Sequence, residues 1–200
     1  MAIKKELDDK QGIADSLNNL GLVYCSKGDL DQALEYHQRS LIIWEELGNR
    51  TNIAKSLNNL GNAYQLKDDL DQALECLQQS LAIKEEQGNR QDIALTVNNL
   101  GEIYRGKGDL DQALEYYQRS LAISEELGIK QDIAMSLGNI GELYRKKGNS
   151  DLALEYYQQS LAIYEKIGND PSTAVVLYEL VWVTLDSNDP SLAQQYLQKL

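Results

Sequence analysis

The chain has 200 residues, of which 31 are acidic and 19 are basic, giving a net charge of −12. Nucleic acids and anionic membranes attract proteins through a positive field, so this balance argues against both as partners. No stretch approaches the roughly 18 consecutive apolar residues of a membrane-spanning helix, and the opening residues lack the apolar segment of a signal peptide. The two cysteines, Cys25 and Cys76, stand at unrelated points of the sequence, which favours reduced thiols over a disulfide framework. We therefore expect a cytoplasmic protein.

His37 is the only histidine of the sequence. A single histidine excludes most metal sites and most histidine-dependent catalysis. The sequence also lacks a nucleophile–base pair, a metal-ligand spacing and a phosphate-binding loop. We therefore predict that the protein is not an enzyme, with no catalytic residue, no bound metal and no cofactor.

Self-similarity with a period of 40 residues dominates the sequence. The segment SLNNLG at residues 16–21 returns as SLNNLG at 56–61, as TVNNLG at 96–101 and as SLGNIG at 136–141. A period of this length is typical of stacked repeat units. We predict a single array over residues 1–200. Residues 1–8 are expected to be the end of a preceding helix, followed by repeats at 9–48, 49–88, 89–128 and 129–168 and by a partial, diverged repeat at 169–200.

Two helices are predicted in each copy. The first, helix A, extends from about Gln91 to Lys107 in the third copy, where apolar residues recur at helical spacing. Each helix A is followed by a residue that tolerates the left-handed conformation of a helix end. These residues are Gly28, Asp68, Gly108, Gly148 and Asn188.

The second helix of each copy, helix B, begins after a side chain that can cap it. The predicted N-caps are Asp29, Asp69, Asp109, Asn149 and Asp189. Pro190 then takes the first helical position of the last copy, where its missing N–H costs little. Gly61 on helix A and Ala73 on helix B would allow the two helices to cross closely. One helix pair cannot bury its own apolar face but stacked pairs can, so we predict an all-α solenoid of antiparallel helix pairs.

Each copy resembles the tetratricopeptide repeat. The residues of the first copy that carry the resemblance are Leu17, Leu20, Gly21, Tyr24, Gly28 and Ala33, and their equivalents recur in register through the fourth copy. The usual period of that family is about 34 residues, so this chain is similar to its long-repeat branch, as in kinesin light chains and bacterial and archaeal sensor proteins. The resemblance implies a right-handed superhelix, a concave groove lined by helix A that binds peptide segments, and no catalysis.

The paired asparagines suggest how a peptide would be held. An asparagine amide offers an acceptor and two donors, so it can contact both the C=O and the N–H of an extended peptide backbone. In the resembling family the asparagine two residues before the glycine of helix A does this. The residues predicted to bind a peptide are Asn19, Asn59, Asn99 and Asn139, with Asn18, Asn58, Asn98, Asn62, Lys55, Arg105 and Arg145 on the same surface. Glu179 occupies the asparagine position of the fifth copy, so the series should stop there.

Two alternatives accompany this prediction. The asparagines could instead bond to the neighbouring repeat and fix its stacking. Arg105 and Arg145 would favour an acidic ligand, or would pair with Glu102 and Glu142 nearby. The function predicted first is a non-catalytic protein–protein interaction scaffold that binds a partner's peptide segment. The alternative is a structural array from a larger signalling or sensor protein that associates with itself through its terminal helices, as a homo-oligomer.

Overall fold

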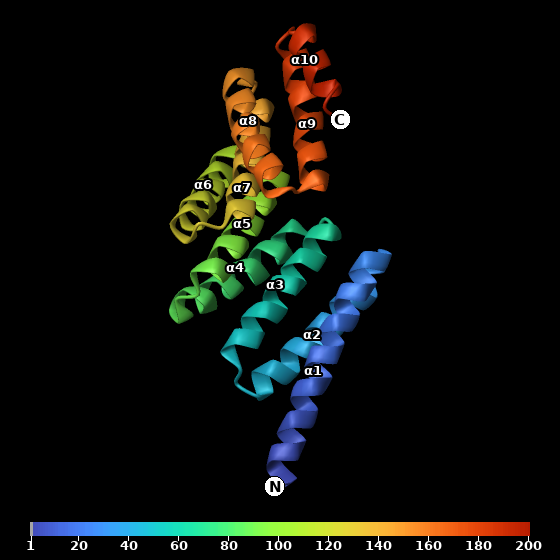
Figure 1. Ribbon diagram of the computed structural model, residues 1–200. Coiled ribbons are helices and arrows are strands. Elements are labelled where there is room, and N and C mark those ends of the chain that lie inside the picture. The colour runs from blue at the N-terminus through green and yellow to red at the C-terminus, as the bar shows by residue number, and fades with distance from the viewer. Residues whose placement is uncertain (1) are drawn as a thin grey trace. The chain divides into compact units, whose positions relative to one another are not determined.

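The computed structural model describes residues 2–200, with side chains from Asp9 onward. Over this range the chain forms ten α-helices and no strand, which confirms the predicted all-α class (Figure 1). The helices are α1 (Ala2–Lys27), α2 (Leu30–Glu46), α3 (Arg50–Leu66), α4 (Leu70–Gln87), α5 (Arg90–Gly106), α6 (Leu110–Leu127), α7 (Lys130–Lys146), α8 (Ser150–Ile167), α9 (Asp170–Asp186) and α10 (Pro190–Leu197). The odd-numbered helices are the predicted helices A, and the even-numbered helices are the predicted helices B.

The helices form two compact units, Met1–Ile103 and Tyr104–Leu200. Within the first unit α1 packs on α2, α2 on α3, and α3 on α4. Within the second unit α6 packs on α7, α7 on α8, α8 on α9, and α9 on α10. Helices α2 and α8 therefore each lie between two helices A, which is the packing of an α-solenoid.

The helix ends follow the chemistry predicted for them. The side chain of Asp69 accepts a hydrogen bond from the backbone N–H of Gln72, and the other four predicted N-caps bond in the same way. Asp68 and Asn188 adopt positive φ angles of 63° and 59°. The glycines at the equivalent positions of the other copies do the same. Short polar side chains can thus replace glycine at these turns.

The N-terminal helix differs from the prediction. We expected residues 1–8 to belong to a separate helix that ends before the first repeat, but α1 continues without a turn from Ala2 to Lys27. Elsewhere helix B is separated from the next helix A by a glycine with positive φ, as at Gly48 and Gly88. The equivalent residue here is Asp8, followed by another aspartate, so no glycine supports a turn.

Two recurring contacts hold each helix pair together. Buried serines of helix B donate to a carbonyl of the paired helix A, as Ser80 Oγ does to the Ala54 carbonyl at 2.7 Å. The glycine of helix A permits close contact, since a Cβ on Gly61 would lie 2.7 Å from Leu77 Cγ. Leu60 and Ala63 then pack on Leu34 of the preceding helix B. These contacts explain why the serine and the glycine recur in the copies.

Candidate functional site

The helix-A surface is the name used here for the side chains that the odd-numbered helices present away from the helices B packed beneath them. In the first unit this surface begins with a hydrogen-bonded group around Asn18. The Asn18 Oδ1 oxygen accepts from Asn59 Nδ2 at 2.8 Å and faces His37 Nδ1 at 3.0 Å. An amide oxygen cannot donate, so His37 carries its proton on Nδ1. Asn18 thereby links α1 to both α2 and α3.

His37 is fully buried in this group. Burial lowers the pKa of its imidazole to about 4, because the charged form loses its hydration. Its ring lies against Gly21, where a Cβ would come within 2.6 Å of Cε1. The Nε2 atom is buried without a hydrogen-bond partner among the described residues. His37 is therefore a neutral packing residue that orients Asn18.

A second polar group connects α3 to α4 and α5. Asn58 Oδ1 lies 3.2 Å from Thr96 Oγ1 and accepts from Lys84 Nζ at 3.4 Å. Lys84 Nζ also donates to Thr96 Oγ1 at 2.6 Å. Lys84 is only 6% exposed, and burial lowers the pKa of its amine. The first asparagine of each pair thus bonds to the following repeat in both copies.

The second asparagine of each pair bonds to the preceding repeat. Asn59 Nδ2 donates to Asn18, and Asn99 Nδ2 donates to Asn62 Oδ1 at 3.2 Å. Both donors are half-buried, whereas Asn19 is exposed. These bonds are of the kind that the stacking alternative requires, and they occupy one N–H of each amide. Asn98 is buried, and Asn139 lies in the second unit at the edge of a pocket.

The charged residues of the helix-A surface form ion pairs. Arg105 lies 2.9 Å from Glu142, on the next helix A. Arg145 lies 3.6 Å from Glu179 and 3.7 Å from an aspartate at the end of α9. Each arginine therefore pairs with a glutamate one repeat ahead. Lys55 is exposed. The ion pairs weaken the case for an acidic ligand.

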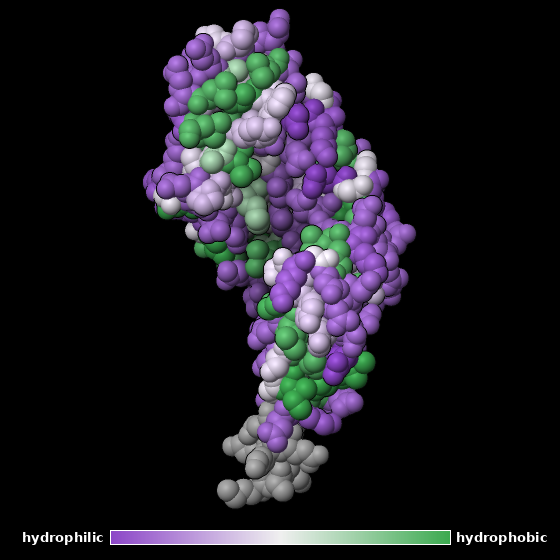
Figure 2. Space-filling model, turned by 90° about the vertical axis from the view of Figure 1, so that its right-hand side faces the viewer, coloured by the Kyte–Doolittle hydropathy of each residue, from purple (hydrophilic) through white to green (hydrophobic). Residues whose placement is uncertain are grey.

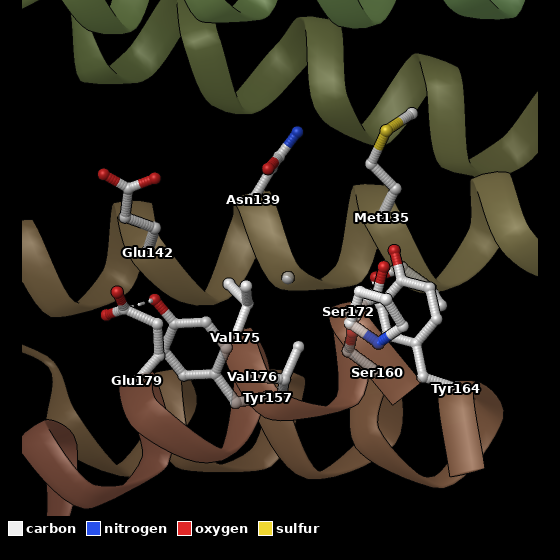
Figure 3. Close-up of a pocket in the computed structure, with 13 residues that line it drawn as sticks. Met135, Asn139, Glu142, Tyr157, Ser160, Tyr164, Ser172, Val175, Val176 and Glu179 are labelled. Atoms are coloured by element: carbon white, nitrogen blue, oxygen red, sulfur yellow. Dashed lines mark hydrogen bonds between the residues drawn. The ribbon is translucent and has the colours of Figure 1, made fainter. Parts of the chain in front are cut away.

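A pocket of about 360 Å³ opens on the helix-A surface of the second unit, between α7 and α9 (Figure 3). Its walls are largely apolar, with Met135 and Val175 on the two helices and the rings of Tyr157 and Tyr164 contributed by α8. The residues that line it are Ala134, Met135, Gly138, Asn139, Glu142, Tyr157, Ser160, Tyr164, Pro171, Ser172, Val175, Val176 and Glu179. Both charged members of this set are glutamates. The pocket is therefore an apolar hollow with an acidic side.

An exposed apolar stripe continues from the pocket along α9. Val175, Tyr178, Trp182 and Leu185 are between 44% and 62% exposed. Their spacing of three, four and three residues places them on one side of the helix. Tyr178 and Trp182 meet edge to face, with ring centroids 6.0 Å apart. Figure 2 shows an apolar patch where α9 lies.

Sequence reasoning missed two of these features. Lys84 occupies a position held by a tryptophan, a serine and a tyrosine in the other copies, so its reach toward Asn58 could not be read from the repeat. Gly138 is visible in the sequence as a break in the paired asparagines, where SLGNIG replaces SLNNLG, but the repeat pattern alone does not predict a pocket there. The described residues contain no cluster of histidine, cysteine and acidic side chains able to hold a metal, and no helix long and apolar enough to cross a membrane.

The antiparallel helix pairs, the small residues at their crossings and the polar surface of the helices A define a helical-repeat protein of the α-solenoid class. The sequence model of the tetratricopeptide repeat matches residues 12–86, 92–166 and 132–200. The chain belongs to the tetratricopeptide repeat family. No curated protein sequence matches it.

Three solved structures illustrate the similarity of fold. BtubC (BKLC) from P. vanneervenii superposes with a TM-score of 0.81 at 18% identity, covering 100% of this chain and 89% of that one. A putative kinesin light chain repeat protein from Podosopora anserina gives 0.77 at 21%, covering 94% and 93%. The tetratricopeptide repeat sensor protein PH0952 from Pyrococcus horikoshii gives 0.84 at 17%, covering 95% of this chain and 30% of that one.

Proposed function

We propose that the protein is a protein–protein interaction scaffold that binds a peptide segment of a partner on its helix-A surface, where the asparagines form a concave groove. Membership of the tetratricopeptide repeat family supports this. Two Rap proteins of similar fold also support it, one complexed with Competence and Sporulation Factor and one in complex with the Phr* peptide. Their TM-scores are 0.81 and 0.76, at 14% and 19% identity.

The observation that carries the proposal is the hydrogen bonding of the Asn59 and Asn99 side-chain amides. Each amide uses one N–H for the bond to the preceding helix A. Among the described residues no hydrogen bond engages the oxygen or the second N–H of either amide. The interhelical bond fixes the side chain in one orientation, so a ligand does not have to order it. The stacking bond and the ligand contact therefore use different atoms of the same residue.

The spacing of the helices suits an extended ligand. Neighbouring helices pack about 8–10 Å apart, and an extended strand rises about 3.3 Å per residue. One amide per repeat would thus meet about every third residue of a peptide. Each such bond contributes about 0.5–1.5 kcal/mol. The asparagines alone would hold a peptide weakly and would not distinguish one sequence from another. Contacts to the side chains of the peptide must therefore supply the remaining affinity and the specificity.

The test is a selection of random peptides displayed on phage against the purified chain. Synthetic copies of the enriched peptides are then titrated against the parent and against a double variant, Asn59→Ala with Asn99→Ala. Loss of two hydrogen bonds predicts an affinity about tenfold or more below that of the parent. A matched variant, Gln78→Ala with Gln118→Ala, removes two exposed amides from helices B and should bind as the parent does.

Stability must be separated from binding, because Asn59 also bonds to Asn18. All titrations are made well below the melting temperature of every variant. Asn19→Ala is added because it removes an exposed amide of the same surface, so that its effect on affinity is not mixed with a large change in stability. If no peptide is enriched, or if the double variant binds every enriched peptide as tightly as the parent, the proposal is wrong.

Self-association through α1 is a second candidate, favoured by one observation. Leu20 is 42% exposed, whereas its equivalents Leu60, Leu100, Ile140 and Leu180 are at most 3% exposed. Val23 is 46% exposed, whereas the equivalent residues are fully buried. At the other end, α10 carries Gln194 where helices B otherwise have the leucine that packs on the next helix A. The exposed equivalents of the buried inter-repeat positions therefore lie on α1.

Sedimentation of the chain over a range of concentrations tests this candidate. Pairing through α1 predicts a mass that rises with concentration and returns to that of the monomer in Leu20→Gln with Val23→Gln. Leu185→Gln, on α9, is the matched control that keeps the α1 face intact. A constant monomer mass for the parent would exclude self-association.

A further inference from the structure

We infer that the pocket between α7 and α9 is a specificity pocket, which takes one large apolar side chain of a bound segment that carries a lysine or arginine beside it. The inference rests on the proposed peptide binding and adds the chemistry of the ligand. It concerns one repeat, because the pocket depends on a glycine that the other copies do not have.

Gly138 has no structural reason to be glycine. Its φ angle is not positive, and a Cβ at this position would meet only Ser160 Oγ at 3.5 Å, an ordinary contact. The glycines at the true crossings differ, since a Cβ on Gly61 or Gly141 would lie within 2.7 Å or 3.1 Å of a neighbouring side chain. A glycine inside a helix costs about 0.5–1 kcal/mol relative to alanine. No packing contact at Gly138 requires a glycine and so accounts for that cost.

The missing side chain opens the pocket. At the same register the other copies carry Asn18, Asn58, Asn98 and Tyr178. Asn58 reaches the following helix A through Thr96, and Asn98 is 5% exposed, so a side chain occupies this space in those repeats. In the fourth copy no side chain fills this space, and the backbone of Gly138 lines the pocket together with Met135 and Val175. The volume of about 360 Å³ falls at the lower end of ligand pockets, which measure about 300–1,000 Å³.

The lining selects an apolar side chain. Met135, Val175, Val176 and the two tyrosine rings supply aliphatic and aromatic surface. Methionine is flexible and adapts to side chains of different shape. Burying one leucine, methionine or phenylalanine side chain contributes more to binding than a single backbone hydrogen bond to Asn139 at the rim. The pocket would therefore dominate the affinity of a segment held by the asparagines.

The charge beside the pocket selects a basic neighbour. Glu142 and Glu179 lie at the same end of the pocket in Figure 3, where the Tyr157 hydroxyl is 3.5 Å from Glu179. Burial and these carboxylates raise the pKa of Tyr157, so the phenol stays neutral and adds no negative charge. Glu142 is paired with Arg105 at 2.9 Å and with Lys146 at 3.4 Å, and Glu179 with Arg145 at 3.6 Å, so a ligand cation would have to compete with these side chains for the two carboxylates that line the pocket.

The test uses the peptides enriched by phage display on the parent chain. We expect an enriched pattern of a leucine, methionine or phenylalanine followed within two residues by a lysine or arginine. Gly138→Asn places in the fourth copy the side chain that the first three carry, and should weaken these peptides about thirtyfold, as removal of a binding hot spot of about 2 kcal/mol does. Gly138→Ala adds only the Cβ, which fits, and should retain most of the affinity.

Three readouts separate this inference from the proposed function. Replacing the apolar residue of the peptide by alanine should cost the parent about as much as Gly138→Asn does, with no further loss when the two changes are combined. Equal melting temperatures of parent and Gly138→Asn show that the fold is intact. If Gly138→Asn binds the enriched peptides as tightly as the parent while Asn59→Ala with Asn99→Ala does not, the pocket is wrong and the peptide groove stands. Enrichment of acidic peptides would overturn the charge preference, and enrichment of none would overturn both proposals.

Discussion

The two units carry nearly the same repeat, yet their helix-A surfaces have different chemistry. In the first unit asparagines join successive helices A, through Asn59 to Asn18 and Asn99 to Asn62. In the second unit the positions equivalent to Asn18 hold Gly138 and Tyr178, and the surface is a pocket beside an exposed apolar stripe. The scaffold beneath them is the same set of helix pairs with the same caps and serine bonds. A repeat scaffold can therefore change its surface by single residues, because the caps, the serine bonds and the close crossings that hold each helix pair do not depend on those residues.

The largest expected effect concerns His37, which only the first unit has. Folding lowers the pKa of its imidazole from the ordinary 6.5 to about 4. Between those values the unfolded chain binds a proton that the folded chain does not, so stability is fully present above pH 6.5 and falls as the pH drops toward 4. A shift of this size amounts to about 3 kcal/mol. Denaturant unfolding of the parent and His37→Tyr at several pH values measures the difference.

His37→Tyr is a matched change, because Tyr117 and Tyr157 occupy this position in the second unit. Acid destabilisation from the carboxylates is common to both proteins and cancels in the comparison. Parallel pH profiles for the two proteins would contradict the prediction and would mean that the imidazole is accessible to water in the folded state.

The next effect separates the two kinds of helix-A glycine. Gly61→Ala should lower the free energy of unfolding by about 2 kcal/mol, because the new Cβ lies 2.7 Å from Leu77 and overpacks the crossing. Gly138→Ala should raise it by about 0.5–1 kcal/mol, since the Cβ fits and the unfolded chain loses freedom. Urea unfolding of both variants beside the parent provides the measurement. A destabilised Gly138→Ala would remove the contrast between the two positions.

A smaller effect distinguishes the two asparagines of one pair. Asn18→Ala removes the acceptor for Asn59 and His37 and should cost about 1–2 kcal/mol of stability. Asn19→Ala, one residue further along an exposed side of α1, should change stability by less than about 0.5 kcal/mol. Thermal unfolding of the two single variants makes the comparison. Equal losses would show that the bond between Asn18 and Asn59 does not contribute to stability.

The smallest effect is expected at the ion pairs of the second unit. Arg105 and Glu142 are 2.9 Å apart but about a quarter exposed, so Arg105→Gln should cost about 0.5 kcal/mol at low salt and less at high salt. Lys67 and Asp31, in the first unit, form a more exposed pair, and Lys67→Gln should cost still less. Unfolding in low and in high sodium chloride measures both. A loss that does not respond to salt would assign Arg105 a packing role instead.

Several features of the fold could be predicted from local chemistry. The caps at Asp29 and Asp69 and the left-handed residues at Gly28 and Asp68 follow from groups close in the sequence, and all are present. The expected helix end at residue 8 was wrong in the structure for a local reason that could have been noticed, since an aspartate stands where the other copies have glycine. Trp182 beside Tyr178 was also predictable, because four residues separate them on one helix.

The role of the asparagines could not be predicted from local chemistry. Their recurrence predicted a shared role, but peptide binding and repeat stacking both required the same residues at the same spacing. Only the positions of neighbouring helices show that Asn59 reaches Asn18 and that Lys84 reaches Asn58 and Thr96. Those partners are between 12 and 41 residues apart in sequence.

The sequence by itself determined the helices, their ends, the pairing of helix A with helix B and the family, because each depends on a pattern within one 40-residue copy. The tertiary structure decided what the surface of the helices A is made of. Whether an amide bonds to a neighbour, or a missing Cβ becomes a pocket, depends on atoms contributed by two or three helices at distances of a few ångströms. Those distances are set by packing between copies, which no single copy encodes.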